Sequence, residues 1–109
     1  MREQASGMRA NLDIPDLVMQ HDMELHKILA RASRNPVFVL LVGAFEGIIA
    51  RTWPIGWRAR TTPEAREAMI ANHEKIAEAV VQGEPERAMQ AMAAHFDETV
   101  RALISAGLV

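Results

Sequence analysis

The chain has 109 residues, of which half are apolar, and its 12 basic and 14 acidic residues give a net charge of −2. This length suits one domain with a single core, and the apolar content excludes a disordered chain. The balanced charge excludes DNA binding that depends on a basic surface. The absence of cysteine excludes disulfides, thiolate metal ligands and cysteine nucleophiles.

The chain carries no feature of export or of membrane insertion. Its first residues lack the apolar core of a signal peptide, so we expect a cytoplasmic protein with no membrane partner. The longest apolar run, Val37 to Ala50, is interrupted by Gly43, Glu46 and Gly47, and is too short to span a bilayer. We interpret this run as part of a buried helix.

The first half of the chain has helical spacing of apolar residues. Residues 2–10 are expected to form the end of a helix. Pro15 suits the first turn of a second helix, with Asp13 as its cap, which ends before Asn35. A third helix from Pro36 to about Thr52 is apolar almost all round and is expected to be the central one.

The second half predicts two more helices. The segment from Trp53 to Trp57 contains Pro and Gly and is expected to break the third helix. A fourth helix starts after the cap Thr62 and runs to Gln82, and a fifth runs from about Glu86 to Ala106, with Gly107 as its stop. Strand signals are absent from the sequence. The predicted fold class is an all-α antiparallel bundle of about five helices.

The histidines are the residues most suited to metal chemistry, and there are four of them: His21, His26, His73 and His95. Asp22 and His26 are four residues apart, so on a helix their side chains leave one face from successive turns. Such a pair can supply two ligands to one ion. His21 lies near the middle of the apolar stripe, where a histidine more often packs against a neighbouring helix.

His73 and His95 lie on either side of the turn at residues 83–85. His73 is ten residues before Gly83, and His95 is ten residues after Pro85. At about 1.5 Å rise per residue, each is roughly 15 Å from the turn, so the two face each other in an antiparallel hairpin. Three neutral imidazoles and one carboxylate suit a divalent cation, Zn²⁺ or else Ni²⁺, Mn²⁺ or Fe²⁺.

Two other interpretations remain open. The Asp-x-x-x-His spacing is common by chance, and structural histidines would leave a metal-free module for dimerisation or ligand binding. The dipeptide His21-Asp22 also occurs in HD-type phosphohydrolases, which are all-α and use His and Asp as metal ligands. However, the chain lacks an acidic residue matched to the distant aspartate of that motif, a Ser-His-Asp order and a glycine-rich phosphate loop. We therefore expect a protein that is not an enzyme.

Three segments resemble a known family. They are DMELH from Asp22, with Asn-Pro following nine residues after its histidine, HEKIAEA from His73, and AMQAMAAH up to His95, preceded by Gly-Glu. Their order and spacing are similar to those of the FCD domain, the C-terminal effector-binding domain of FadR-type GntR transcriptional regulators. Leu25 stands where the family signature has phenylalanine, a core substitution that does not affect the ligands.

The resemblance implies a function for the whole of residues 1–109 as an FCD-like ligand-binding domain. It implies a homodimeric bundle of six or seven helices in which Asp22, His26, His73 and His95 bind the ion. The ion helps to hold a small organic acid, which modulates DNA binding by an N-terminal winged helix-turn-helix domain. That domain and the first one or two sensor helices have no counterpart in this sequence, so we expect a truncated sensor domain.

Two further residues are candidates for contact with the effector. Arg51, near the end of the third helix, can pair with a carboxylate through two parallel hydrogen bonds, although a solvated cation at a helix end is an equally good interpretation. Asn72 is the second candidate because it precedes His73. Trp53 and Trp57 can line a pocket or a dimer face, but we expect them to cover the end of the bundle.

Overall fold

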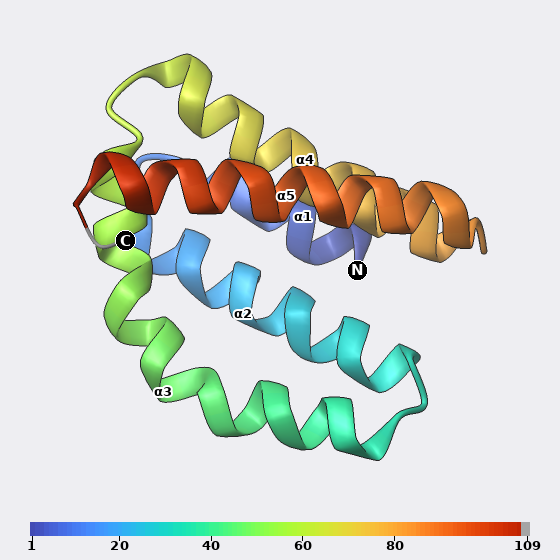
Figure 1. The fold of residues 1–109 in the computed structure, drawn as a ribbon. Coiled ribbons are helices and arrows are strands. Elements are labelled where there is room, and N and C mark those ends of the chain that lie inside the picture. Colours follow the sequence, from blue (N-terminus) through green and yellow to red (C-terminus); the bar gives the residue numbers. More distant parts are fainter. Residues whose placement is uncertain (108–109) are drawn as a thin grey trace.

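A computed structural model describes residues 1–107 of the chain, without the side chain of Phe45. This part of the chain forms helices without any strand, which confirms the predicted all-α class (Figure 1). The helices are α1 (Arg2–Ala10), α2 (Pro15–Ala32), α3 (Pro36–Ala59), α4 (Pro63–Val81) and α5 (Pro85–Ser105).

Proline and short polar side chains define where the helices begin. Each of α2 to α5 has proline in its first turn, where the missing N–H has no helical partner to lose. Asn35 caps α3, because its Oδ1 accepts from the Val37 amide at 3.0 Å, and Thr62 caps α4 as expected. The expected cap Asp13 is wrong: Ile14 occupies the N-cap of α2, without a side-chain cap bond in the described structure.

The helices pack around the antiparallel pair α4 and α5, which run side by side in Figure 1. The short helix α1 packs against both α2 and α4, and α2 separates it from α3. The main core cluster joins four helices and consists of Met8, Val18, Trp57, Met69 and Ile70. This packing holds α2, α4 and α5 in fixed register, which positions the histidines discussed below.

The expected break between Trp53 and Trp57 is wrong, because α3 continues through Pro54 to Ala59. Proline inside a helix removes one backbone hydrogen bond. Helical continuity, however, places the two indoles one turn apart, where they stack with ring centroids 5.3 Å apart. Trp57 is only 3% exposed, and burial of this large side chain offsets the lost bond.

The expectation that α3 is a buried central helix is also wrong. The helix lies at the edge of the bundle (Figure 1) and bends by 59° between Ala44 and Glu46. In its first arm, Pro36–Ala44, the side chains of Val37 and Leu40 are 62% and 71% exposed. No single described helix is long and apolar enough to cross a membrane; the two arms of α3 reach that length and composition only together.

The close packing of α1 on α2 yields a first testable prediction. His21 packs against α1, as expected, and its Nδ1 lies 2.8 Å from Gln4 Oε1. A Cβ on Gly7 would lie 2.5 Å from the His21 ring. Gly7→Ala is therefore expected to lower the free energy of unfolding by about 1–3 kcal/mol, measured by urea denaturation. Gly43→Ala is the matched control, because no described atom lies within 4 Å of its Cβ; equal effects would contradict the packing.

Candidate metal centre

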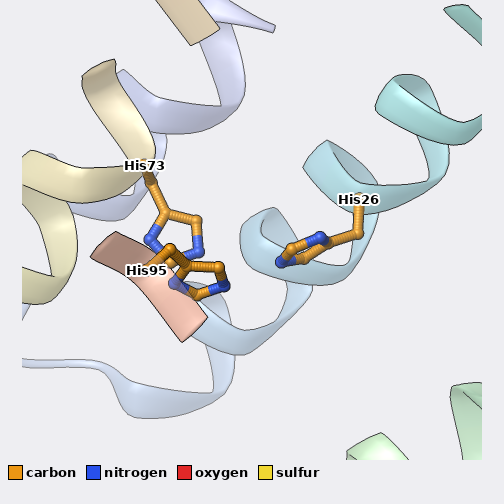
Figure 2. Close-up of side chains that lie close together, drawn as sticks. All are labelled: His26, His73 and His95. Carbon is orange, nitrogen blue, oxygen red and sulfur yellow. The ribbon is translucent and has the colours of Figure 1, made fainter. Parts of the chain in front are cut away.

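Three helices direct histidine rings to one point in the interior. His26 comes from α2, His73 from α4 and His95 from α5, and the three rings point toward one another (Figure 2). One ring nitrogen from each lies within 4.8 Å of the others. The ring centroids of His73 and His95 are 4.4 Å apart, so the two residues face each other across the hairpin as their spacing about the turn predicts.

Asp22 joins this cluster from the same face of α2 as His26. Its Oδ1 lies 2.8 Å from His73 Nε2 and 3.1 Å from His26 Nε2. Its Oδ2 accepts a hydrogen bond of 2.8 Å from the indole Nε1 of Trp53. All four residues suggested by the sequence therefore meet, and Trp53 fixes the orientation of the carboxylate, a role that no local sequence pattern predicts.

His73 is fully buried, and both of its nitrogens face oxygen acceptors. Nδ1 donates to the Met69 carbonyl at 2.7 Å, and Nε2 faces Asp22. Burial lowers the pKa of His73, but the charge and hydrogen bond of Asp22 outweigh it, so the pKa is raised overall. Burial has the opposite effect on Asp22 and raises its pKa, yet the neighbouring histidines hold the pKa of this carboxyl well below its ordinary value. Without a metal, the positive charge of protonated His73 therefore balances the negative charge of Asp22.

His95 has the opposite character. Burial, together with the nearby charges of His73 and His26, lowers its pKa to about 3, so the ring is neutral near pH 7. Its Nδ1 is buried and has no hydrogen-bond partner within the described residues. Such an orphaned nitrogen is rare and costly in a protein interior. A neutral imidazole beside two other histidines and a carboxylate is a donor set that fits a divalent transition metal.

A cavity of about 480 Å³ adjoins the cluster. This volume is in the range of small-molecule sites. Helices α2, α3 and α5 supply most of its walls, and apolar side chains predominate; these include Met23, Phe38, Val42, Ile49, Met92, Phe96 and Leu103. The charged side chains in the wall besides Asp22 occur in ion pairs: Lys27 with Glu46 at 2.8 Å, and Arg60 with Glu98.

The two suggested effector contacts do not reach this cavity. Arg51 is exposed on α3, and neither Arg51 nor Asn72 is among the residues described in the cavity wall. The helix continues past Thr52, which changes the face on which each later residue lies. As a result Gly56 and Arg60 follow Thr52 at every fourth position and line the cavity with it, together with Trp53. The four-residue spacing of Thr52, Gly56 and Arg60 indicates this face only on the assumption that the helix runs through Pro54.

Comparison with known families agrees with this arrangement. The family model of the FCD domain matches residues 1–98. The chain belongs to the FCD domain family. Comparisons with curated proteins and with solved structures find no match. The FCD domain is the effector-binding domain of GntR-family transcriptional regulators, a regulatory rather than a catalytic domain, so the resemblance identified in the sequence is confirmed.

Membership of the FCD family also bears on the phosphohydrolase interpretation. That interpretation requires His21 and Asp22 to act at one metal. In this FCD domain the His21 ring instead packs against Gly7 and Gln4 of α1, while Asp22 faces His26 and His73. The family and the direction of His21 therefore both argue against the phosphohydrolase alternative.

Proposed function

We propose that this FCD domain senses a small organic acid with the help of a divalent metal ion, for which Zn²⁺ is the first candidate. Asp22, His26, His73 and His95 are the proposed ligands. The observation that carries this proposal is the buried Nδ1 of His95, which has no partner among the described residues although its ring lies against two other histidines. The proposed setting is a cytoplasmic regulator that binds DNA through a separate winged helix-turn-helix domain.

Electrostatics favours the exchange of a proton for a metal ion at this position. His73 Nε2 turns to the cluster because its Nδ1–H is held by the Met69 carbonyl, the usual arrangement of a metal-ligating histidine. Trp53 holds Asp22 in the same way. A divalent cation held by these residues would supply the charge that Asp22 otherwise receives from a protonated His73, and it would offer Lewis acidity toward a carboxylate in the cavity.

The positions of the ligands explain how binding can be transmitted. The four side chains come from α2, α4 and α5, and α3 forms a further wall of the cavity. A metal and an acid that contact all four helices favour the arrangement in which these helices are closest together. The domain then responds by a shift in population between two packings, and the attached DNA-binding domain senses this shift.

Removal of the metal tests the proposal. Chelation is expected to lower the melting temperature and to abolish binding of small carboxylates, because both depend on the ion. Differential scanning calorimetry and isothermal titration calorimetry with a carboxylate panel measure the two effects, and readdition of Zn²⁺ is expected to restore them. A chelated sample that melts at the same temperature and binds the acids equally well would refute the proposal.

A metal-free module for ligand binding is the second candidate. The observation that favours it is the Asp22–His73 pair, in which the carboxylate is already balanced by the imidazolium. Such a buried pair is self-sufficient without an ion. Elemental analysis separates the two candidates: the metal-dependent function requires about one equivalent of transition metal per chain after dialysis against trace Zn²⁺, and the metal-free module requires none.

We also propose that the domain forms homodimers, and that the exposed arm Pro36–Ala44 contributes to the interface. This arm contains no charged side chain, and large exposed apolar patches mark interaction sites. Leu40→Glu is expected to raise the dissociation constant of the dimer at least about tenfold, because it buries a charge. Sedimentation equilibrium measures this change, with Gln90→Glu on the exposed side of α5 as control. A Leu40→Glu protein that dimerises normally would exclude this arm.

A further inference from the structure

Arg60, at the C-terminal end of α3, is a buried cation whose donors are only partly used. The residue is 7% exposed and lines the cavity beside the histidines. Its Nε and Nη2 both donate to the Glu98 carboxylate, with Nη2 2.8 Å from Oε2. Within the described residues, Nη1 has no hydrogen-bond acceptor, since the guanidinium bonds come from Nε and Nη2. A buried guanidinium with an unused donor is well suited to receive an anion.

Gly56 shows which way Nη1 faces. A Cβ on Gly56 would lie 3.1 Å from Arg60 Nη1, so the two groups are in contact. Arg60 lines both this cavity and a neighbouring groove formed by the end of α3, α4 and α5, whereas Gly56 lines the cavity and not the groove. The contact with Gly56 therefore favours the cavity side of Arg60 for Nη1. The absence of a side chain at Gly56 leaves this donor open to a ligand.

The ion pair with Glu98 places the guanidinium close to the histidine cluster. Glu98 and His95 are three residues apart on α5, so they lie on the same side of the helix in successive turns. Glu98 also holds the Arg60 fork in one orientation through two bonds, which reduces the entropy lost when a ligand binds. Arg60 and the three histidines also line the same cavity, so one anion in this cavity can contact both the cluster and Nη1.

The balance of charge limits the kind of anion. The pairs Lys27–Glu46 and Arg60–Glu98 are each neutral. A divalent ion with the Asp22 carboxylate and three neutral imidazoles leaves one positive charge. One carboxylate cancels it, whereas a dicarboxylate would leave a negative charge among apolar side chains, at a high desolvation cost. The remaining walls, which include Val42, Ile49 and Leu103, match a hydrocarbon body.

We infer that Arg60 is the second anchor of the effector carboxylate, and that the effector is a monocarboxylic acid with an apolar body. This inference rests on the proposed metal-dependent function, in which a bound ion would be the first anchor of the carboxylate. Arg60 then determines specificity: it distinguishes a carboxylate from an alcohol of equal size, and the neutral pairs around it disfavour a second negative charge. The apolar walls select for the hydrocarbon body.

Calorimetric titrations of the Zn²⁺-loaded protein with hexanoate, hexan-1-ol and adipate test the inference. The wild-type protein is expected to bind hexanoate at least about tenfold more tightly than either of the other compounds. A double variant, Arg60→Gln with Glu98→Gln, keeps a neutral hydrogen-bonded pair in place of the ion pair. It is expected to bind hexanoate about tenfold more weakly or worse, with unchanged affinity for Zn²⁺.

Gly56→Ala is the second variant, and it keeps Arg60 and Glu98 intact. The added methyl group crowds Nη1, so hexanoate affinity is expected to fall at least about threefold while Zn²⁺ affinity and the melting temperature are retained. If both variants bind Zn²⁺ normally and bind hexanoate as tightly as the wild type, the inference about Arg60 is overturned, whereas the proposed function is not. Failure of the wild-type protein to bind Zn²⁺ would instead overturn the proposed function, and the inference with it.

Discussion

Replacement of His73 by alanine is expected to weaken Zn²⁺ binding by more than about a hundredfold, since loss of even an outer partner of a metal ligand costs about 10–100-fold. His73 is the ring closest to both Asp22 and His95, so its removal takes away the most central of the proposed ligands. Competition titration with a zinc chelator measures the change. His21→Ala is the matched control, because His21 contacts Gln4 of α1 instead of the cluster, and its Zn²⁺ affinity is expected to equal that of the wild type.

The same substitution is expected to destabilise the metal-free protein by about 3–5 kcal/mol, because it leaves the buried Asp22 carboxylate without its main partner. Urea denaturation in the presence of a chelator measures this loss. Asp22→Asn combined with His73→Ala removes the unpaired charge and is expected to recover part of the stability. If His73→Ala alone were as stable as the wild type, the ion pair between Asp22 and His73 would not exist in solution.

The stability of the metal-free protein is expected to reach its maximum near pH 6.5. The pKa of His95 is lowered to about 3 by burial and by the charges of His73 and His26, whereas an unfolded histidine titrates near pH 6.5. As the pH falls below 6.5, the unfolded chain takes up a proton at His95 and the folded protein does not. The free energy of unfolding then falls by up to about 1.4 kcal/mol per pH unit.

His73 accounts for the other side of this maximum. Its pKa is raised overall, because Asp22 and the Met69 carbonyl outweigh burial. The contribution of His73 to the free energy of unfolding is therefore complete below about pH 6.5, and it is lost as the pH rises through the pKa of His73 in the folded protein. Asp22 has a lowered pKa, so its contribution is lost only as the pH falls below about 3.9 toward the folded value.

Urea denaturation between pH 5.0 and 8.0 tests this pH dependence. For the wild type, a loss of up to about 2 kcal/mol is expected between pH 6.5 and 5.0. His95→Gln is expected to flatten this acidic limb and to leave the alkaline limb unchanged, because the limbs belong to different histidines. A wild-type curve that rises steadily down to pH 5.0 would contradict the assignment of a neutral His95.

Local sequence features are sufficient to predict the helices, the shared face of Asp22 and His26, and the facing of His73 and His95. The meeting of the two pairs is expected only from the resemblance to the FCD domain. Proline in the first turn acts through its own fixed backbone angle, so Pro15, Pro36 and Pro63 mark helix starts independently of their surroundings. The level of His73 and His95 in the hairpin depends only on helix rise and on their equal distance from the turn. These properties belong to short segments, which is why they can be inferred without a structure.

The errors concern features that depend on packing between distant segments. Pro54 is tolerated within α3 because Trp57 is buried by residues of α1, α2 and α4, a contact that no local pattern shows. The role of Trp53 depends on a bond to Asp22, 31 positions away. Arg60 was not recognised for the same reason, since its partner Glu98 lies on α5. The sequence favours Arg51 because a helix that ends near Thr52 places this residue at its end.

X-ray diffraction from crystals grown with Zn²⁺, recorded at the zinc absorption edge, tests the central claim most directly. The account predicts one anomalous peak per chain, about 2.0–2.2 Å from Asp22 and from one nitrogen each of His26, His73 and His95. A peak at another position, or no peak in crystals grown with excess Zn²⁺, would contradict it.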